Sequence, residues 1–204
     1  MQVAQLVLCL PSEKVPGNLF KEQSTKKLSW EEAVSLVLNG SCVFVKREKA
    51  EKAGSYKQLF FNVMIRNIRG DILCYSQTSE DNETDCDRCS LGIAGRISKD
   101  DFGDTPKRSK IGKAVHPACE RKLRETVGVH EGFDNLTFLG IVHERQSDTG
   151  KGCIVLVYEY SLSPHGMIRL GEELGKPQWV SPDEIKQYEK NIDPWSRHAL
   201  ELMQ

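Results

Sequence analysis

The chain has 204 residues, of which 39% are hydrophobic and 28% are charged. These values are typical of a globular protein with a sizeable core, and they argue against collagen, a coiled coil or wholesale disorder. The 28 basic and 29 acidic side chains leave a net charge of −1, so the chain lacks the electrostatic footprint expected for binding nucleic acid or an anionic membrane. Its length suits one α/β or α+β domain with an additional segment.

The apolar run near the start, residues 7–10, is much shorter than a membrane span and has no basic leader before it. We therefore expect a cytoplasmic protein. The cysteines number seven, which is odd, and four of them lie in hydrophobic strings. Those four are predicted to be small buried thiols in a reducing compartment. They are Cys9, Cys42, Cys74 and Cys153.

The N-terminal part of the chain alternates strand and helix signals. Strands are expected over residues 2–10 and 41–46. Between them Ser29 is a predicted helix N-cap, Glu32 completes a capping box, and the helix is expected to end at Gly40.

The middle of the chain contains a predicted β-hairpin, with strands over 59–67 and 71–76. The charged stretch before it, 47–57, fits either a short helix or a solvated connector, and we favour the connector. After the hairpin a polar loop leads into a glycine-containing strand over 91–97.

An amphipathic helix is predicted over residues 113–127, because apolar side chains recur there at every fourth position. Gly128 is its expected C-terminal stop. The apolar stripe consists of Val115, Cys119, Leu123 and Val127.

The remaining elements are strands over 136–145, 152–160 and 178–180, followed by two helices. Each of these helices is predicted to begin with an N-cap and a proline at the first helical position, Ser181-Pro182 and Asp193-Pro194.

The segment ACERKLRETVGV (118–129), preceded by LGIAGRI (91–97), resembles a divergent Nudix box. The order of motifs over residues 40–204 is similar to that of the MutT-like phosphoesterases within the Nudix hydrolase superfamily. The resemblance implies a Nudix-like α/β/α sandwich with a mixed, curved sheet. It also implies that residues 58–204 form the Nudix-like domain and that residues 1–57 are an elaborating N-terminal segment.

In the Nudix family, glutamates on one helix face bind Mg²⁺ or Mn²⁺, and the metal activates a water for attack on a diphosphate. Carried over to matching positions, the resemblance implies catalytic roles for Glu125 and Arg121. It implies metal binding by Glu125, the Ala94 backbone, Asp101 and Glu120, and substrate binding by Gly95 and Arg96.

The match to the box is uneven. Lys122 and Thr126 stand where the pattern has glutamates, so both the charge and the number of ligands for a divalent cation are reduced. Asp101 follows Gly95 at the expected interval, but the distance along the chain from there to Arg121 is longer than in the pattern. Missing carboxylates could come from elsewhere: Asp100, Asp101, Glu120, Glu144 or Glu159.

Ordinary structural roles also account for these residues. Glu125 is spaced to form a surface ion pair with Arg121 one helical turn away, as is Glu120 with Arg124. The glycines of LGIAGRI could permit close packing or a bulge in a strand.

A second possible metal site combines Cys86-x-x-Cys89 with His116-x-x-Cys119. Two pairs with two-residue gaps suit a tetrahedral zinc ion. However, Cys119 belongs to the predicted apolar stripe, which favours burial, and we expect no zinc.

Three functions remain open at this point. The first is a divergent Nudix-fold protein that binds a nucleoside-diphosphate-linked or other diphosphate ligand, with a degenerate metal site and at most weak hydrolysis. The second is a fully active Mg²⁺- or Mn²⁺-dependent hydrolase with rerouted acidic ligands. The third is a zinc-stabilised interaction domain. No nucleic-acid or membrane partner is expected, and the sequence does not define the substrate or the oligomeric state.

Overall fold

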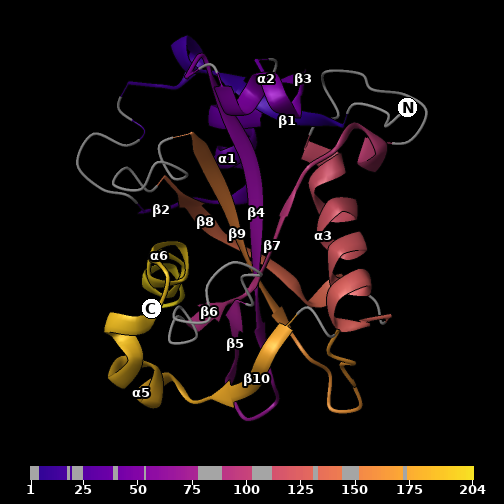
Figure 1. Ribbon diagram of the computed structural model, residues 1–204, viewed down its shortest axis with the longest axis vertical. Helices are drawn as coiled ribbons and strands as arrows, with labels where there is room; N and C mark the ends of the chain where they lie inside the picture. The colour runs from indigo at the N-terminus through magenta and orange to yellow at the C-terminus, as the bar shows by residue number, and fades with distance from the viewer. Residues whose placement is uncertain are drawn as a thin grey trace.

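A computed structural model describes residues 5–17, 19, 25–38, 41–52, 54–77, 89–102, 112–130, 133–143, 152–171 and 174–204. Within these ranges the chain forms one mixed sheet of ten strands, and its main path runs in the order β10-β5-β4-β9-β8-β2 (Figure 1). The strands are β1 (Leu6–Pro11), β2 (Thr25–Lys27), β3 (Val43–Lys46), β4 (Tyr56–Arg66), β5 (Ile72–Gln77), β6 (Cys89–Leu91), β7 (Ile93–Arg96), β8 (Leu136–Val142), β9 (Cys153–Ser161) and β10 (Leu174–Val180).

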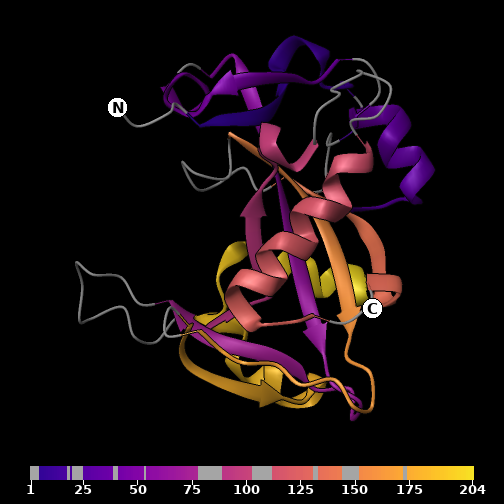
Figure 2. The same ribbon diagram turned by 90° about the vertical axis from the view of Figure 1, so that its right-hand side faces the viewer.

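Helices lie on both faces of this sheet (Figure 2). They are α1 (Trp30–Ala33), which continues as the π-helix η2 (Val34–Leu38), then α2 (Arg47–Lys52), α3 (Gly112–Val127), α5 (Pro182–Ile185) and α6 (Pro194–Met203). Short 3-10 turns are η1 (Ser12–Lys14), η3 (Lys99–Phe102), η5 (Phe133–Asn135) and η6 (Lys186–Asn191). Among the helices so described, none is long and apolar enough to cross a membrane.

The long strand β4 organises the sheet, since it pairs in parallel with β9 and antiparallel with β1, β5 and β7. Its side chains alternate between two cores, as the pleat of a strand requires. Phe61, Val63 and Ile65 pack on the face that α3 covers, whereas Phe60 and Met64 pack on the face that α5 and α6 cover. The α/β/α sandwich with a mixed sheet is therefore confirmed.

The segment before residue 58 contributes to the same sheet. Strand β1 pairs with both β3 and β4, and β2 pairs with β8. The predicted connector over 47–57 is wrong in its first half, because residues 47–52 form α2. An ion pair one turn apart, from Arg47 Nε to Glu51 Oε1 at 2.8 Å, and the burial of Ala50 favour the helix.

The predicted helix N-caps are confirmed, whereas the predicted stop at Gly40 lies outside the described residues. Ser29 and Ser181 each form a complete capping box, with Glu32 and Glu184 respectively. Asp193 accepts a hydrogen bond from the Ser196 backbone N–H at the start of α6. These ends depend on chemistry within four residues, which is why the sequence alone predicts them.

The predicted helix over 113–127 corresponds to α3, and all four residues of its apolar stripe are fully buried. Gly128 ends the helix in a left-handed conformation, with φ +61°, that favours glycine. The segment after β9 then covers this end, because the N–H groups of Arg169 and Gly171 donate to the carbonyls of Val127 and Thr126 at 2.9 and 3.1 Å. This segment therefore covers one side of the last turn of α3, while Arg124 and Glu125 on the same turn stay exposed.

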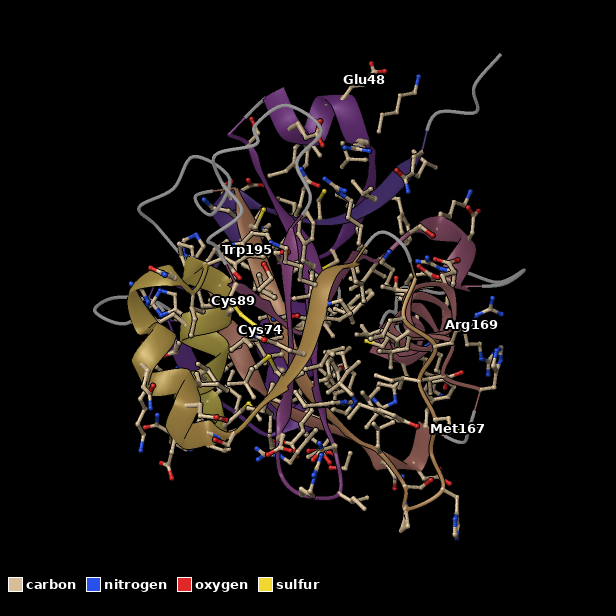
Figure 3. All side chains as sticks on the ribbon, turned by 60° about the horizontal axis from the view of Figure 1, so that its bottom comes forward. Glu48, Cys74, Cys89, Met167, Arg169 and Trp195 are labelled. Carbon is tan, nitrogen blue, oxygen red and sulfur yellow. A yellow bond between two sulfur atoms is a disulfide. The ribbon has the colours of Figure 1, made fainter. Side chains whose placement is uncertain are left out.

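A disulfide joins Cys74 of β5 to Cys89 of β6 (Figure 3). Cys74 is buried as predicted, but it is bonded to Cys89 and is not a free thiol, whereas Cys9, Cys42 and Cys153 are free and buried. Burial raises the pKa of Cys9 and of Cys42 to about 12.

We expect reduction of this disulfide to lower the free energy of unfolding by about 3 kcal/mol, because the bond restricts the conformations of the unfolded chain. The two cysteines are 15 residues apart in sequence. Urea unfolding with and without dithiothreitol measures the change. In Cys74→Ser, reductant should have no such effect; an equal loss in that variant would contradict the assignment.

Candidate functional site

The residues that the Nudix-box resemblance singles out lie on three consecutive elements. Ala94, Gly95 and Arg96 belong to β7, Asp101 to η3, and the box helix is α3. Strand β7 pairs antiparallel with β4, and α3 lies against β7 and η3. These elements are therefore arranged as the resemblance implies. The hydrogen bonds and ion pairs of their side chains differ from the implied roles.

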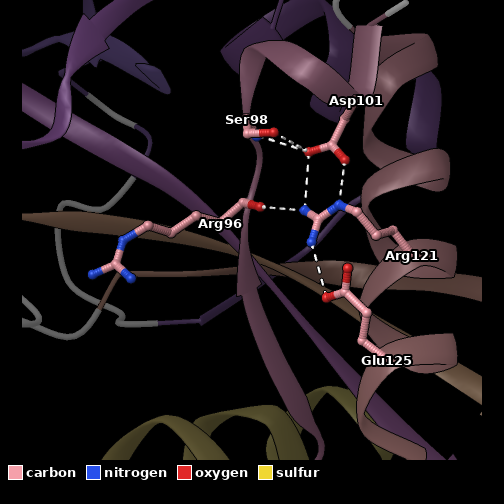
Figure 4. Close-up of polar contacts among 5 residues, drawn as sticks. All are labelled: Arg96, Ser98, Asp101, Arg121 and Glu125. Carbon is pink, nitrogen blue, oxygen red and sulfur yellow. Dashed lines mark hydrogen bonds and ion pairs between the residues drawn. The ribbon is translucent and has the colours of Figure 1, made fainter. Parts of the chain in front are cut away.

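Arg121 is the centre of the polar contacts at this place (Figure 4). Its Nε donates to Asp101 Oδ1 at 2.7 Å and its Nη2 to Asp101 Oδ2 at 3.1 Å. Nη1 donates to Glu125 Oε2 at 3.3 Å, and Nη2 also reaches the Arg96 carbonyl at 3.4 Å. The hydrogen bond to Asp101 is the main reason that the pKa of Arg121 is raised above its ordinary value.

Both carboxylate oxygens of Asp101 accept hydrogen bonds from neighbouring protein groups. Besides the bidentate pair with Arg121, its Oδ2 accepts from the Ser98 backbone N–H at 2.8 Å and from the Ser98 hydroxyl at 3.1 Å. Only 2% of its side chain is exposed. A carboxylate that is buried and bidentate to a guanidinium is neutralised where it stands, so Asp101 does not offer its charge to a cation.

The two helix carboxylates do not converge with Asp101 as a metal site would require. Glu125 is held by Arg121, while Glu120 lies 3.7 Å from Arg124 on another side of the helix. Five residues of α-helix turn a side chain by about 140° about the axis, so Glu120 and Glu125 point apart. Within the described ranges, no group of three or more His, Cys, Asp or Glu side chains could hold a metal ion. These donors do not fit a divalent cation.

Thr126 occupies a glutamate position of the box at a place where a carboxylate would be buried. It is 2% exposed, and its Oγ1 has no hydrogen-bond partner in the structure as described. The covering segment that contains Gly171 bonds to its backbone carbonyl. The structure thus explains the threonine as a core residue under that segment.

The glycines of LGIAGRI have packing roles. A Cβ at Gly95 would come within 2.3 Å of Phe61 Cζ, so the absence of a side chain lets the buried Phe61 ring lie against β7. Gly92 has φ +83° at the step between β6 and β7, and a Cβ there would lie 2.4 Å from Asn62 Oδ1. The packing interpretation of these glycines is therefore supported, and Ala94 is exposed beside them.

Arg96, a predicted substrate residue, directs its side chain away from α3. Figure 4 shows its carbonyl facing Arg121 while the guanidinium points to the other side of β7. There it lies over the Phe60 ring, 4.9 Å from the centroid, and 3.5 Å from Glu51. Burial and then Arg47 lower the pKa of Arg96. The structure therefore does not bring this guanidinium together with Glu125.

The structure does not bring together the described members of the possible zinc set. Cys89 is bonded to Cys74 on the α6 side of the sheet, whereas Cys119 is buried in the core beneath α3. His116 contacts the rings of Trp30 and Tyr158, and burial lowers its pKa. Cys86 and the possible ligand Glu144 lie outside the described residues.

Sequence reasoning missed the role of Asp101 as the partner of Arg121. The available signal was the acidic residue itself, but the long insertion before α3 concealed its distance from the helix. Its position three residues after Ser98, whose backbone N–H donates to its carboxylate, is the local clue that points to a structural carboxylate.

No protein-family model matches the sequence, and no curated protein matches it significantly. Solved structures do match the fold. Tm1382, a protein named as a candidate Nudix hydrolase, is 18% identical, with a TM-score of 0.78 and 97% of each chain covered.

Two further matches each cover 72% of this chain. One is a MutT Nudix hydrolase from Burkholderia pseudomallei, 19% identical, with a TM-score of 0.50, 72% of this chain and 97% of that chain. The other is a bifunctional NMN adenylyltransferase/ADP-ribose pyrophosphatase from Francisella tularensis in complex with AMP and Mn. It is 13% identical, with a TM-score of 0.51, and the match covers 72% of this chain and 41% of that chain. The chain therefore has the Nudix fold.

Proposed function

We propose that this chain is a divergent Nudix-fold protein that binds a nucleoside-diphosphate-linked or other diphosphate ligand and hydrolyses it slowly at most. The observation that carries the proposal is the Arg121 guanidinium, which engages the carboxylates of both Asp101 and Glu125. These are two of the acids on which a metal site in the Nudix box would depend.

The side chains available at the box argue against fast hydrolysis. A divalent cation would supply the charge that stabilises the transition state of phosphoryl chemistry, which is usually the largest catalytic contribution. Here Lys122 adds a positive charge at one ligand position and Thr126 is buried at another. Binding of a ligand requires fewer of these groups than turnover does, so binding is the function that the site supports best.

The ligand class follows from the fold and from the resemblance of residues 91–97 and 118–129 to the Nudix box. One structural neighbour is named as an ADP-ribose pyrophosphatase and is in complex with AMP and Mn. We extend that ligand class to this chain as part of the proposal, with nucleotides and dinucleotides as the compounds to be tested.

A turnover screen tests the proposal. We expect ADP-ribose, dinucleotides and nucleoside triphosphates to be hydrolysed at less than about 0.01 per second with Mg²⁺ or Mn²⁺. Glu125→Gln should change this rate by less than about twofold, as should Glu48→Gln, a matched change on the exposed surface of α2. Calorimetric titration of the same compounds should show binding to the wild type.

A rate above about 1 per second that collapses in Glu125→Gln and persists in Glu48→Gln would instead establish an active hydrolase with rerouted ligands. Absence of both turnover and binding across the screen would contradict the proposed ligand class.

A further inference from the structure

Strand β6 joins the start of α6 to the sheet through hydrogen bonds on both of its sides. Toward the sheet, its three residues pair antiparallel with β5. Toward α6, the Cys89 carbonyl accepts from the Asp193 N–H at 3.1 Å, and the Leu91 N–H donates to Ser196 Oγ at 2.7 Å. Asp193 is the N-cap of α6, and its side chain accepts from the Ser196 N–H. The first turn of α6 therefore depends on the position of β6.

The two ends of β6 are held in different ways. At one end Leu91 is buried, and its carbonyl accepts a hydrogen bond from the Asn62 side chain at 3.2 Å. The next residue, Gly92, has φ +83°, a left-handed conformation that favours glycine. At the other end, the disulfide from Cys89 to Cys74 is a covalent link to the sheet (Figure 3). Loss of the disulfide would therefore free the Cys89 end first, while Leu91 stays attached.

The middle of β6 favours such a release. Ser90 is 3% exposed, and its hydroxyl has no hydrogen-bond partner in the structure as described. A buried hydroxyl of this kind has lost its hydration without gaining a bond, so the present position of the strand costs free energy. Because the strand has three residues, few backbone hydrogen bonds offset that cost. The position of β6 therefore depends on the bond between Cys74 and Cys89.

Thiol chemistry in the described chain is concentrated at this bond. Cys74 is 3% exposed, whereas Cys89 is only partly buried, so a thiolate from solution is expected to attack the Cys89 sulfur. The four free cysteines are buried, and burial raises the pKa of Cys153, for example, to about 11. Such thiols keep their protons at neutral pH and react slowly. Where thiols are kept reduced, a protein disulfide usually serves in catalysis or redox sensing.

We propose that the Cys74–Cys89 disulfide is a redox switch, which holds β6 and the first turn of α6 in place when oxidised and releases the Cys89 end of β6 when reduced. Release of that end removes the acceptor of the Asp193 N–H, so α6 loses a hydrogen bond to the sheet at its start. The two cysteines belong to the core on the α6 face, opposite to α3. The switch is therefore independent of the proposed diphosphate ligand.

The reductant is a dithiol. Its first thiolate attacks the Cys89 sulfur, the bond between the two protein sulfurs breaks, and the Cys74 sulfur leaves with the electron pair and takes a proton. The second thiolate attacks the reagent sulfur of the mixed disulfide, which closes the dithiol into its own disulfide and frees Cys89 as a thiol. The protein gains two electrons and two protons, and the dithiol loses them.

Trp195, the second residue of α6, can report on the switch, because its ring lies 5.4 Å from that of Phe60, centroid to centroid. The full chain is labelled with fluorotryptophan and followed by fluorine NMR without denaturant, and Trp195→Phe and Trp30→Phe assign the signals. We expect dithiothreitol to move the Trp195 signal toward that of free fluorotryptophan, and oxidised glutathione to return it. The Trp30 signal, from the face that α3 covers, should stay in place.

A disulfide that only stabilises the folded chain would leave both signals in place, since the fold is unchanged under these conditions. An unmoved Trp195 signal in the reduced protein would therefore overturn the proposal. Movement of both signals would also overturn it, because the change would then not be confined to β6 and α6.

Variants connect the signal to the bond. Cys89→Ser should show the reduced position of the Trp195 signal with and without dithiothreitol. Cys153→Ser, a change at a free cysteine in the same core, is the matched control and should respond as the wild type does. Peptide mapping of the oxidised chain should link Cys74 to Cys89, and a bond from Cys89 to Cys86 instead would overturn the assignment. If Cys89→Ser failed to fold, the wild-type measurement would still decide.

Discussion

Thr126→Glu, which would restore a glutamate of the box pattern, is expected to lower the free energy of unfolding by about 3 to 5 kcal/mol. Thr126 is 2% exposed beneath the segment that carries Gly171. A carboxylate introduced there would lose its hydration without gaining a partner among the described residues. Urea unfolding at neutral pH measures the loss.

The loss should shrink at low pH. Burial raises the pKa of a carboxyl group, so the charged form that opposes folding disappears as the pH falls. Thr126→Val is the matched control. It keeps the shape but removes a buried hydroxyl that has no partner in the described structure, and it should raise stability by about 1 kcal/mol. Wild-type stability in Thr126→Glu together with tighter Mn²⁺ binding would show that this position is open to solvent and metal.

Leu123→Ala is expected to lower the free energy of unfolding by about 2 to 5 kcal/mol, because Leu123 is a fully buried member of the α3 stripe. The truncation removes apolar contacts and leaves a cavity between α3 and the sheet. Lys113→Ala, on the exposed side of the same helix, should change stability by no more than about 0.5 kcal/mol. Similar values for the two variants would mean that the packed face of the helix is misassigned.

Local signals carried most of the fold prediction. The caps at Ser29, Ser181 and Asp193 and the stop at Gly128 each depend on a few neighbouring residues. The stripe of α3 repeats at the helical period over four turns, so its buried face could be deduced without knowing what it packs against.

The contacts that define the site could not be deduced in this way, because they join residues far apart in sequence. Arg121 reaches Asp101 twenty residues away, across an insertion that the box pattern lacks. The direction of Arg96 depends on the pairing of β7 with β4, and a shift of one residue would exchange the two faces. The contact between Cys74 and Cys89 likewise depends on the register of β5 with β6.

Mn²⁺ binding in the absence of nucleotide, followed by the electron paramagnetic resonance signal of the free ion, tests the degenerate metal site most directly. We predict a dissociation constant above about 1 mM. It should be the same in Glu125→Gln, because Glu125 is engaged by Arg121. Binding with a dissociation constant near about 10 μM that is lost in Glu125→Gln would contradict the account and establish Glu125 as a metal ligand.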